Sequence, residues 1–153
     1  AKMTKKILQN LKYDKKTIKN VASLVELHLR PHTFKMGWTD SAVRRYIVDA
    51  GEVLEDLNNL VRADVTTKNK QKAQEIFEKL DEMETRIKEV LEKEEMSKLR
   101  PPISGDEIMS LFDLEPGPKV GVIMKALYEQ RINEGEVSKE EAIKLAKETF
   151  NNL

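Results

Sequence analysis

The sequence of 153 residues contains no cysteine and only two histidines. Without cysteine the chain has no disulfide framework, no thiolate metal site and no cysteine nucleophile, and two histidines cannot build a multi-histidine metal cluster. No apolar run approaches the length of a membrane span, and no signal-peptide pattern opens the chain. We therefore predict a soluble, cytoplasmic protein without a membrane partner.

The net charge of zero hides an uneven distribution along the chain. Residues 1–72 carry 15 Lys and Arg against 8 Asp and Glu, whereas residues 73–153 carry 12 against 19. The two parts therefore have formal charges of +7 and −7. A basic surface on the first part predicts an anionic partner, and the acidic second part predicts a face that repels it.

Apolar residues recur at steps of three and four, and no segment alternates with the period of a strand, which predicts an all-α fold of about seven to eight helices. We expect helices over 2–12, 15–30, 40–50, 52–64, 104–111 and 118–133, a loop over 31–38, and a final helix after residue 138. One long central strut helix is expected over about 68–98. The expected subdomains are 1–67 (basic), 68–100 (the linking helix) and 101–153 (the C-terminal tail).

The seam of the long helix, with Leu80, Met83 and Ile87 at heptad-like steps, either packs on neighbouring helices or forms a coiled coil with a second copy. We favour the first, and hence a monomer. The first helix starts at residue 2 without a capping side chain, so we expect a piece of a longer protein.

Several helix starts carry capping signals. Asp14 suits the N-cap of the second helix, and Ser104 and Ser138, each with a glutamate three residues later, suit capping boxes. Thr66 and Thr67 are expected to cap the long helix.

Lys68, Lys70 and Lys72 then place positive charge in its first turns, which is the wrong sign for the helix dipole. This local cost favours an anion bound at a basic helix start, although a solvated lysine face is equally consistent with the pattern.

Other residues suggest chemistry more weakly. His28 and His32, four residues apart, allow a metal or acid–base site with Asp64, but Pro31 separates the two histidines. A hydrolytic metal needs about three ligands and a water position, which these residues do not assemble, so structural roles are preferred. Trp38 and Tyr46 either stack on a base or belong to the core, and we assign Trp38 to the core.

The turn at residues 116–121 suits either a phosphate or a tight interhelix turn. Its helix start exposes backbone N–H groups beside Lys119. In the second reading Gly121 lets another backbone come close.

Four segments occur here in order: 38–46 (WTDSAVRRY), 62–69 (RADVTTKN), 104–109 (SGDEIM) and 116–121 (PGPKVG). They resemble the C-terminal half of bacterial tRNA nucleotidyltransferases, the CCA-adding enzymes related to bacterial poly(A) polymerases. The branch that carries an HD-type domain after its polymerase head is the most similar. The resemblance extends over nearly the whole chain.

In that family an N-terminal head holds the metal-binding carboxylates and selects CTP and ATP, and the helical remainder holds the tRNA acceptor stem and elbow. The head motifs are absent, so the resemblance implies that this chain is the non-catalytic, tRNA-binding part of a transferase. This part is expected to have no cofactor or metal of its own. Mg²⁺ and CTP or ATP are expected only in the head. Asp64 matches the closing aspartate of HD domains, whose earlier motifs are missing here.

The candidate RNA contacts share a positive charge next to these segments: Arg44, Arg45, Arg62, Lys68, Lys70, Lys72 and Lys119. Such residues would read RNA backbone and shape, because the deep groove of A-form RNA is closed to side chains. The competing hypotheses are part of an HD-type phosphohydrolase with an incomplete metal site, and a helical dimerisation module.

Overall fold

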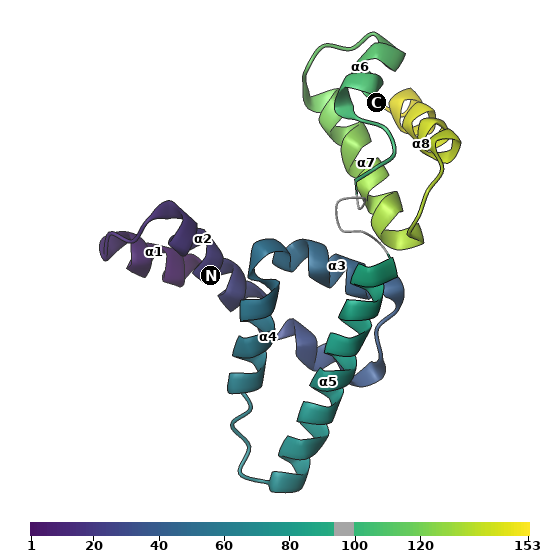
Figure 1. Cartoon of the computed structure of the whole chain (residues 1–153). Coiled ribbons are helices and arrows are strands. Elements are labelled where there is room, and N and C mark those ends of the chain that lie inside the picture. Colours follow the sequence, from purple (N-terminus) through teal and green to yellow (C-terminus); the bar gives the residue numbers. More distant parts are fainter. Residues whose placement is uncertain (94–99) are drawn as a thin grey trace. The chain divides into compact units, whose positions relative to one another are not determined.

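The computed structural model describes residues 1–93 and 100–153, with the backbone alone at residues 35 and 36. Within these residues the chain forms eight α-helices, two 3₁₀ segments and no strand, which confirms the predicted all-α fold (Figure 1). The contacts divide the chain into two compact units. Unit 1 comprises Ala1–Thr39 and Arg45–Glu89, and unit 2 comprises Asp40–Arg44 and Val90–Leu153. None of the described helices is both long and apolar enough to cross a membrane.

Unit 1 begins with a helical hairpin and continues through short helices into the long one. Its elements are α1 (Lys2–Asn10), α2 (Lys15–Leu27), η1 (Arg30–Met36), most of α3 (Asp40–Ala50), η2 (Gly51–Val53), α4 (Leu54–Ala63) and most of α5 (Lys70–Lys93). Asp14 caps α2 as predicted, accepting the Thr17 N–H at 3.0 Å. The predicted loop over 31–38 was wrong: a 3₁₀ helix forms there, because Pro31 already has the φ that a first helical turn needs.

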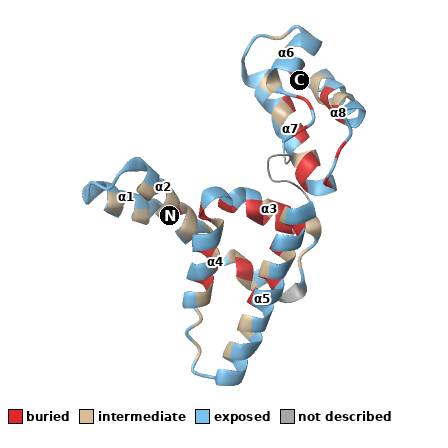
Figure 2. Ribbon diagram, in the orientation of Figure 1, coloured by how far each residue is buried: buried red, intermediate tan, exposed pale blue. Residues whose placement is uncertain are grey.

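The core of unit 1 lies where α3, α4 and α5 face one another (Figure 2). Its fully buried side chains are Tyr46, Ile47, Leu57, Val61 and Met83. The seam of α5 is covered by this chain's own helices, so the dimerisation hypothesis loses its apolar surface. The predicted stretch of the long helix beyond residue 93 lies outside the described residues.

Unit 2 contains α6 (Gly105–Phe112), α7 (Pro118–Glu134) and α8 (Lys139–Asn151). Their facing sides bury one apolar cluster, formed by Ile103, Ile108, Ile123, Leu127, Val137, Ala142 and Ala146. At its edge Phe112 and Phe150 stack, with ring centroids 4.6 Å apart. The small alanines of α8 fit this cluster because they let α8 approach α7 closely.

Both predicted capping boxes are confirmed. Ser104 accepts the Glu107 N–H, while the Glu107 carboxylate accepts the Ser104 N–H at 2.8 Å. Ser138 and Glu141 repeat this arrangement at the start of α8. Each box satisfies two N–H groups that the helix geometry leaves without a partner.

The capping carboxylates make unit 2 sensitive to acid. Hydrogen bonding by Lys139, and then by the Ser104 N–H, lowers the pKa of Glu107 below its ordinary value of 4.5. A lowered pKa gives stability that is full above pH 4.5 and is lost as the pH falls through the folded-state pKa. We expect Glu107→Gln, which keeps the box, to flatten the acid limb of a thermal-melting series between pH 6 and 3. Glu140→Gln, outside the box, is the matched control, and an identical slope in both variants would contradict this account.

Candidate nucleic-acid interface

The turn between α4 and α5 presents the three lysines that the sequence singled out. Lys68, Lys70 and Lys72 are all exposed, and no ion pair engages them in the described part of the chain. The cap differs from the prediction: Asn69 Oδ1 accepts the Lys72 N–H at 3.1 Å, while Thr67 Oγ1 accepts the Asn69 N–H at 3.4 Å. Asparagine next to the first helical residue is the stronger cap, so the threonine prediction was wrong.

Because Asn69 is the cap, Lys70 is the first residue of α5 and Lys72 the third. Their positive charges therefore lie beside the unpaired N–H groups and the positive end of the helix dipole. The first turn of α5 contains no acidic residue to compensate. This turn concentrates positive charge and has the chemistry of a phosphate-binding surface.

A second helix start, that of α7, carries Lys119. Pro118 occupies the first turn as predicted, no side chain caps the helix, and Lys119 is exposed. Gly121 does not allow another backbone to come close, since a Cβ there would meet nothing within 4 Å among the described residues; that prediction was wrong. Lys119 therefore lies at an open helix start in unit 2.

Arg62 is committed to neighbouring carboxylates within unit 1. Its Nη2 lies 2.5 Å from Asp81 Oδ1 and its Nε 2.9 Å from Glu84 Oε1, which ties α4 to α5. Hydrogen bonds to Glu84 and then to Asp81 raise the pKa of the guanidinium. Two acidic partners already neutralise this arginine, so we do not keep it among the proposed RNA contacts.

Arg44 is buried inside unit 2, with only 8% of its surface exposed. Its Nη1 donates to the carbonyl oxygen of Ile132 at 3.1 Å, near the end of α7. Gly135 lies directly against the guanidinium. Arg44 therefore has a structural role and leaves the set of surface contacts, whereas the half-buried Arg45 stays a prediction.

The residues considered for a metal site do not come together. Asp64 is exposed at the end of α4, and His28 Nδ1 lies 2.9 Å from the carbonyl oxygen of Val25. Within residues 1–93 and 100–153 no three His, Asp or Glu side chains form a group that would hold a metal ion. The side chains present therefore do not fit the metal of an HD-type site.

The two aromatic candidates differ in exposure. Tyr46 is fully buried, its hydroxyl donates to Asn58 Oδ1 at 3.0 Å, and burial raises the pKa of its phenol. Trp38 is half-buried, lies 5.1 Å from the Tyr46 ring, and faces a hollow that Glu82 and Glu89 also line. Arg86 also lines the hollow and pairs with Glu89, its Nη1 2.7 Å from Glu89 Oε2.

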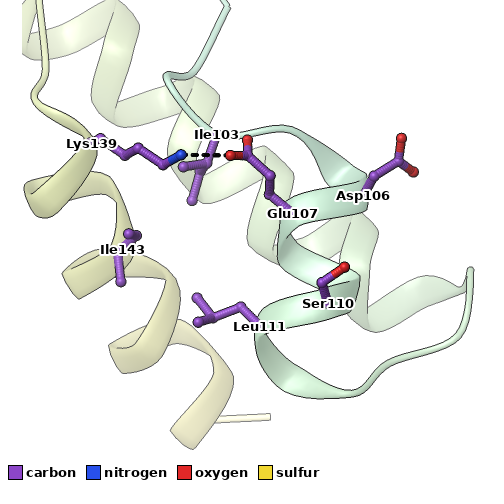
Figure 3. A pocket seen from close by; sticks show the side chains of 7 residues that line it. All are labelled: Ile103, Asp106, Glu107, Ser110, Leu111, Lys139 and Ile143. Atoms are coloured by element: carbon purple, nitrogen blue, oxygen red, sulfur yellow. Dashed lines mark hydrogen bonds and ion pairs between the residues drawn. The ribbon is translucent and has the colours of Figure 1, made fainter.

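A groove between α6 and α8 was not anticipated from the sequence. It has a volume of about 500 Å³, and Figure 3 shows Ile103, Leu111 and Ile143 pointing into it. On its rim the Nζ of Lys139 lies 2.6 Å from Glu107 Oε1. The Glu107 carboxylate neutralises the charge of this lysine, so the groove is an apolar surface and not a phosphate-binding one.

Sequence analysis also left out the lysines of the first two helices. All seven are exposed: Lys2, Lys5, Lys6, Lys12, Lys15, Lys16 and Lys19. The composition of residues 1–25, with Asp14 as the single acidic residue, carried the signal. These lysines precede the motif segments, which begin at residue 38.

Comparison with known proteins adds a family. The family model described as "tRNA nucleotidyltransferase domain 2 putative" matches residues 1–146. The chain is 34% identical over 133 residues to the A-adding tRNA nucleotidyltransferase of Deinococcus radiodurans, covering 86% of the chain and 29% of that protein. It is 35% identical over 134 residues to the CC-adding tRNA nucleotidyltransferase of Thermus thermophilus, covering 86% and 28%. The chain thus spans less than a third of these relatives. No solved structure matches it.

Proposed function

This chain belongs to the family of tRNA nucleotidyltransferase domain 2, and on that premise we propose that it is the tRNA-binding part of a tRNA nucleotidyltransferase. In this proposal it holds the acceptor stem and elbow of tRNA while an N-terminal polymerase head adds the CCA nucleotides. Mg²⁺ and CTP or ATP belong to the head, and this chain supplies no catalytic residue. We further propose that it acts in the cytoplasm as a monomer.

The observation that carries the proposal is the exposed, unpaired lysine cluster at the start of α5, formed by Lys68, Lys70 and Lys72. Lysines there lower the stability of the helix, because the dipole favours carboxylates at that end. Positive charge that is retained although it lowers the stability of the helix is typical of a binding site. The cluster carries no planar group suited to reading base edges, which fits recognition of RNA backbone and shape.

Charge reversal at this cluster is expected to move binding and stability in opposite directions. In Lys68→Glu/Lys70→Glu/Lys72→Glu, we expect the log–log salt dependence of tRNA binding to lose about 2 to 3 units of slope, since each phosphate contact contributes roughly 0.7 to 0.9. The same variant should gain about 0.3 to 1 kcal/mol of unfolding free energy per acid placed in the first turn. Binding titrations across a salt series and urea unfolding measure the two effects.

A matched control has the same net charge as the triple variant at the start of α5. Lys79→Glu/Lys88→Glu/Lys93→Glu reverses three exposed lysines farther along α5, so it changes net charge equally without touching the helix start. Equal losses of tRNA binding in both variants would show that net charge alone acts, and would contradict the proposed contact.

A further inference from the structure

The first 25 residues form a lysine-rich helical hairpin in unit 1, made of α1, its turn and the first part of α2. We call it the lysine hairpin. It carries seven lysines against one acidic residue, a formal charge of +6. That residue, Asp14, is engaged as the cap of α2, where hydrogen bonding by Thr17 lowers its pKa. Its carboxylate therefore accepts the N–H and the hydroxyl of Thr17 rather than any lysine ammonium.

The lysines of the hairpin are almost all without an acidic partner. Of the hairpin lysines Lys16 alone is ion-paired within the described part of the chain, with its Nζ 3.7 Å from Glu52 Oε2. Both of those side chains are more than three-quarters exposed, so the pair is weak and screened by salt. Arg62, by contrast, forms ion pairs with two carboxylates, those of Asp81 and Glu84. The hairpin therefore offers six free ammonium groups.

These ammonium groups form rows rather than a scattered set. Lys2, Lys5 and Lys6 lie at steps of three and four on α1, and Lys15 and Lys19 repeat this spacing on α2. Residues at such steps lie on one face of a helix, with Cβ atoms about 5 to 6 Å apart. The opposite side of α2 is the packed one, because Thr17 and Val21 are half-buried. Each helix thus presents a row of positive charge to solvent.

We propose that the lysine hairpin is a second RNA-backbone contact, distinct from the lysine cluster of α5; this inference rests on the proposed function. Figure 1 shows the hairpin and the α4–α5 turn at different ends of unit 1, so both contact RNA only when the RNA extends along the unit. Rows of ammonium groups suit the evenly spaced phosphates of an RNA strand. Because the two contacts engage different phosphates, their contributions to the salt dependence add.

The hairpin also exposes apolar side chains, so an anionic membrane surface is the competing partner. Met3, Ile7 and Leu11 are between 50% and 76% exposed. A membrane-surface helix normally carries Trp, Phe or Leu on such a face. The hairpin has no Trp or Phe, and its one aromatic residue, Tyr13, lies in the turn. The three apolar side chains lie along α1 and its C-cap, whereas the lysine rows occur on both helices. Its charge pattern therefore favours RNA.

The test compares two variants that each remove four positive charges. Lys5→Gln/Lys6→Gln/Lys15→Gln/Lys19→Gln acts on the hairpin, and the control, Lys79→Gln/Lys88→Gln/Lys125→Gln/Lys144→Gln, acts on exposed lysines of α5, α7 and α8. Measuring tRNA binding across a salt series, we expect the hairpin variant to lose about 3 units of log–log slope and the control to keep the wild-type slope. Circular dichroism should show unchanged helix content in both.

If the hairpin variant and the control bind tRNA alike, the hairpin inference is wrong and the proposed function stands. If the wild type binds no tRNA at low salt, both are wrong.

Lysine acetylation of the wild-type chain provides a measurement that needs no variant. Excess tRNA should protect hairpin lysines relative to Lys79 and Lys88. Protection by phosphatidylserine vesicles without protection by tRNA would overturn the inference in favour of a membrane.

Discussion

Gly135→Ala is expected to destabilise unit 2 by about 2.5 to 6 kcal/mol, combining a backbone cost of roughly 1 to 3 kcal/mol with the disturbance of a buried charged hydrogen bond worth about 1.5 to 3 kcal/mol. Gly135 has a φ of +84°, which side chains rarely adopt. A Cβ there would lie 2.8 Å from Arg44 Nη2. The guanidinium cannot move away freely, because it is buried and donates to Ile132. Urea unfolding followed by circular dichroism measures the loss.

Gly51→Ala is the matched control for this prediction. Gly51 has a similar φ of +51°, but a Cβ there meets nothing within 4 Å among the described residues. It therefore measures the cost of a positive φ without a clash. The excess loss at Gly135 should shrink when Gly135→Ala is made in an Arg44→Ala background, since the clash is then gone. Equal losses for the two glycines would contradict a contact with Arg44.

Ile123→Ala should cost about 2 to 5 kcal/mol, the usual range for removing a buried isoleucine side chain from a packed core. Ile123 is fully buried between α6, α7 and α8. Val122, the preceding residue on α7, is 45% exposed, so Val122→Ala is expected to change stability by less than about 0.5 kcal/mol. The pair shares one helix and similar chemistry, so burial is the variable tested by urea unfolding. Similar losses for both residues would contradict the packing described for unit 2.

The sequence predicted the features that depend on neighbouring residues. Helical periodicity, the capping boxes at Ser104 and Ser138, the cap at Asp14 and the first-turn proline of α7 are all recorded within four residues of where they act. These local signals have a direct physical cause, since each supplies a hydrogen bond or a φ angle that a helix start needs.

Two arginines of the candidate set have partners that are distant in the sequence. Arg62 looked like a free cation because Asp81 and Glu84 lie about twenty residues away, on another helix. Arg44 looked like a surface residue because its acceptor, Ile132, is 88 residues away. Local pattern does not record such contacts, and so the candidate site moved from arginines of the motif segments to exposed lysines at helix starts and in the lysine hairpin.

The threonine cap and Gly121 were misread for a different reason. In both places the residue type suits the assigned role, but a neighbour or the geometry decides otherwise. Asn69 is closer to the first turn of α5 than the threonines are. Gly121 lies on an exposed side of α7, where no backbone approaches among the described residues. A suitable residue type is therefore not enough to assign a role, because the neighbouring residues and the local geometry decide it.

The central claim is that this chain binds tRNA by recognising the shape and the phosphate backbone of the RNA. Competition between two nucleic acids tests this claim most directly. Labelled tRNA bound to the wild-type chain at physiological ionic strength is challenged with unlabelled tRNA or with duplex DNA of equal phosphate count. Because A-form RNA differs from B-form DNA in groove shape and in its 2′-hydroxyls, we predict that tRNA displaces the label at lower concentration than DNA. Equal displacement by both would contradict the claim and leave only a non-specific cationic surface.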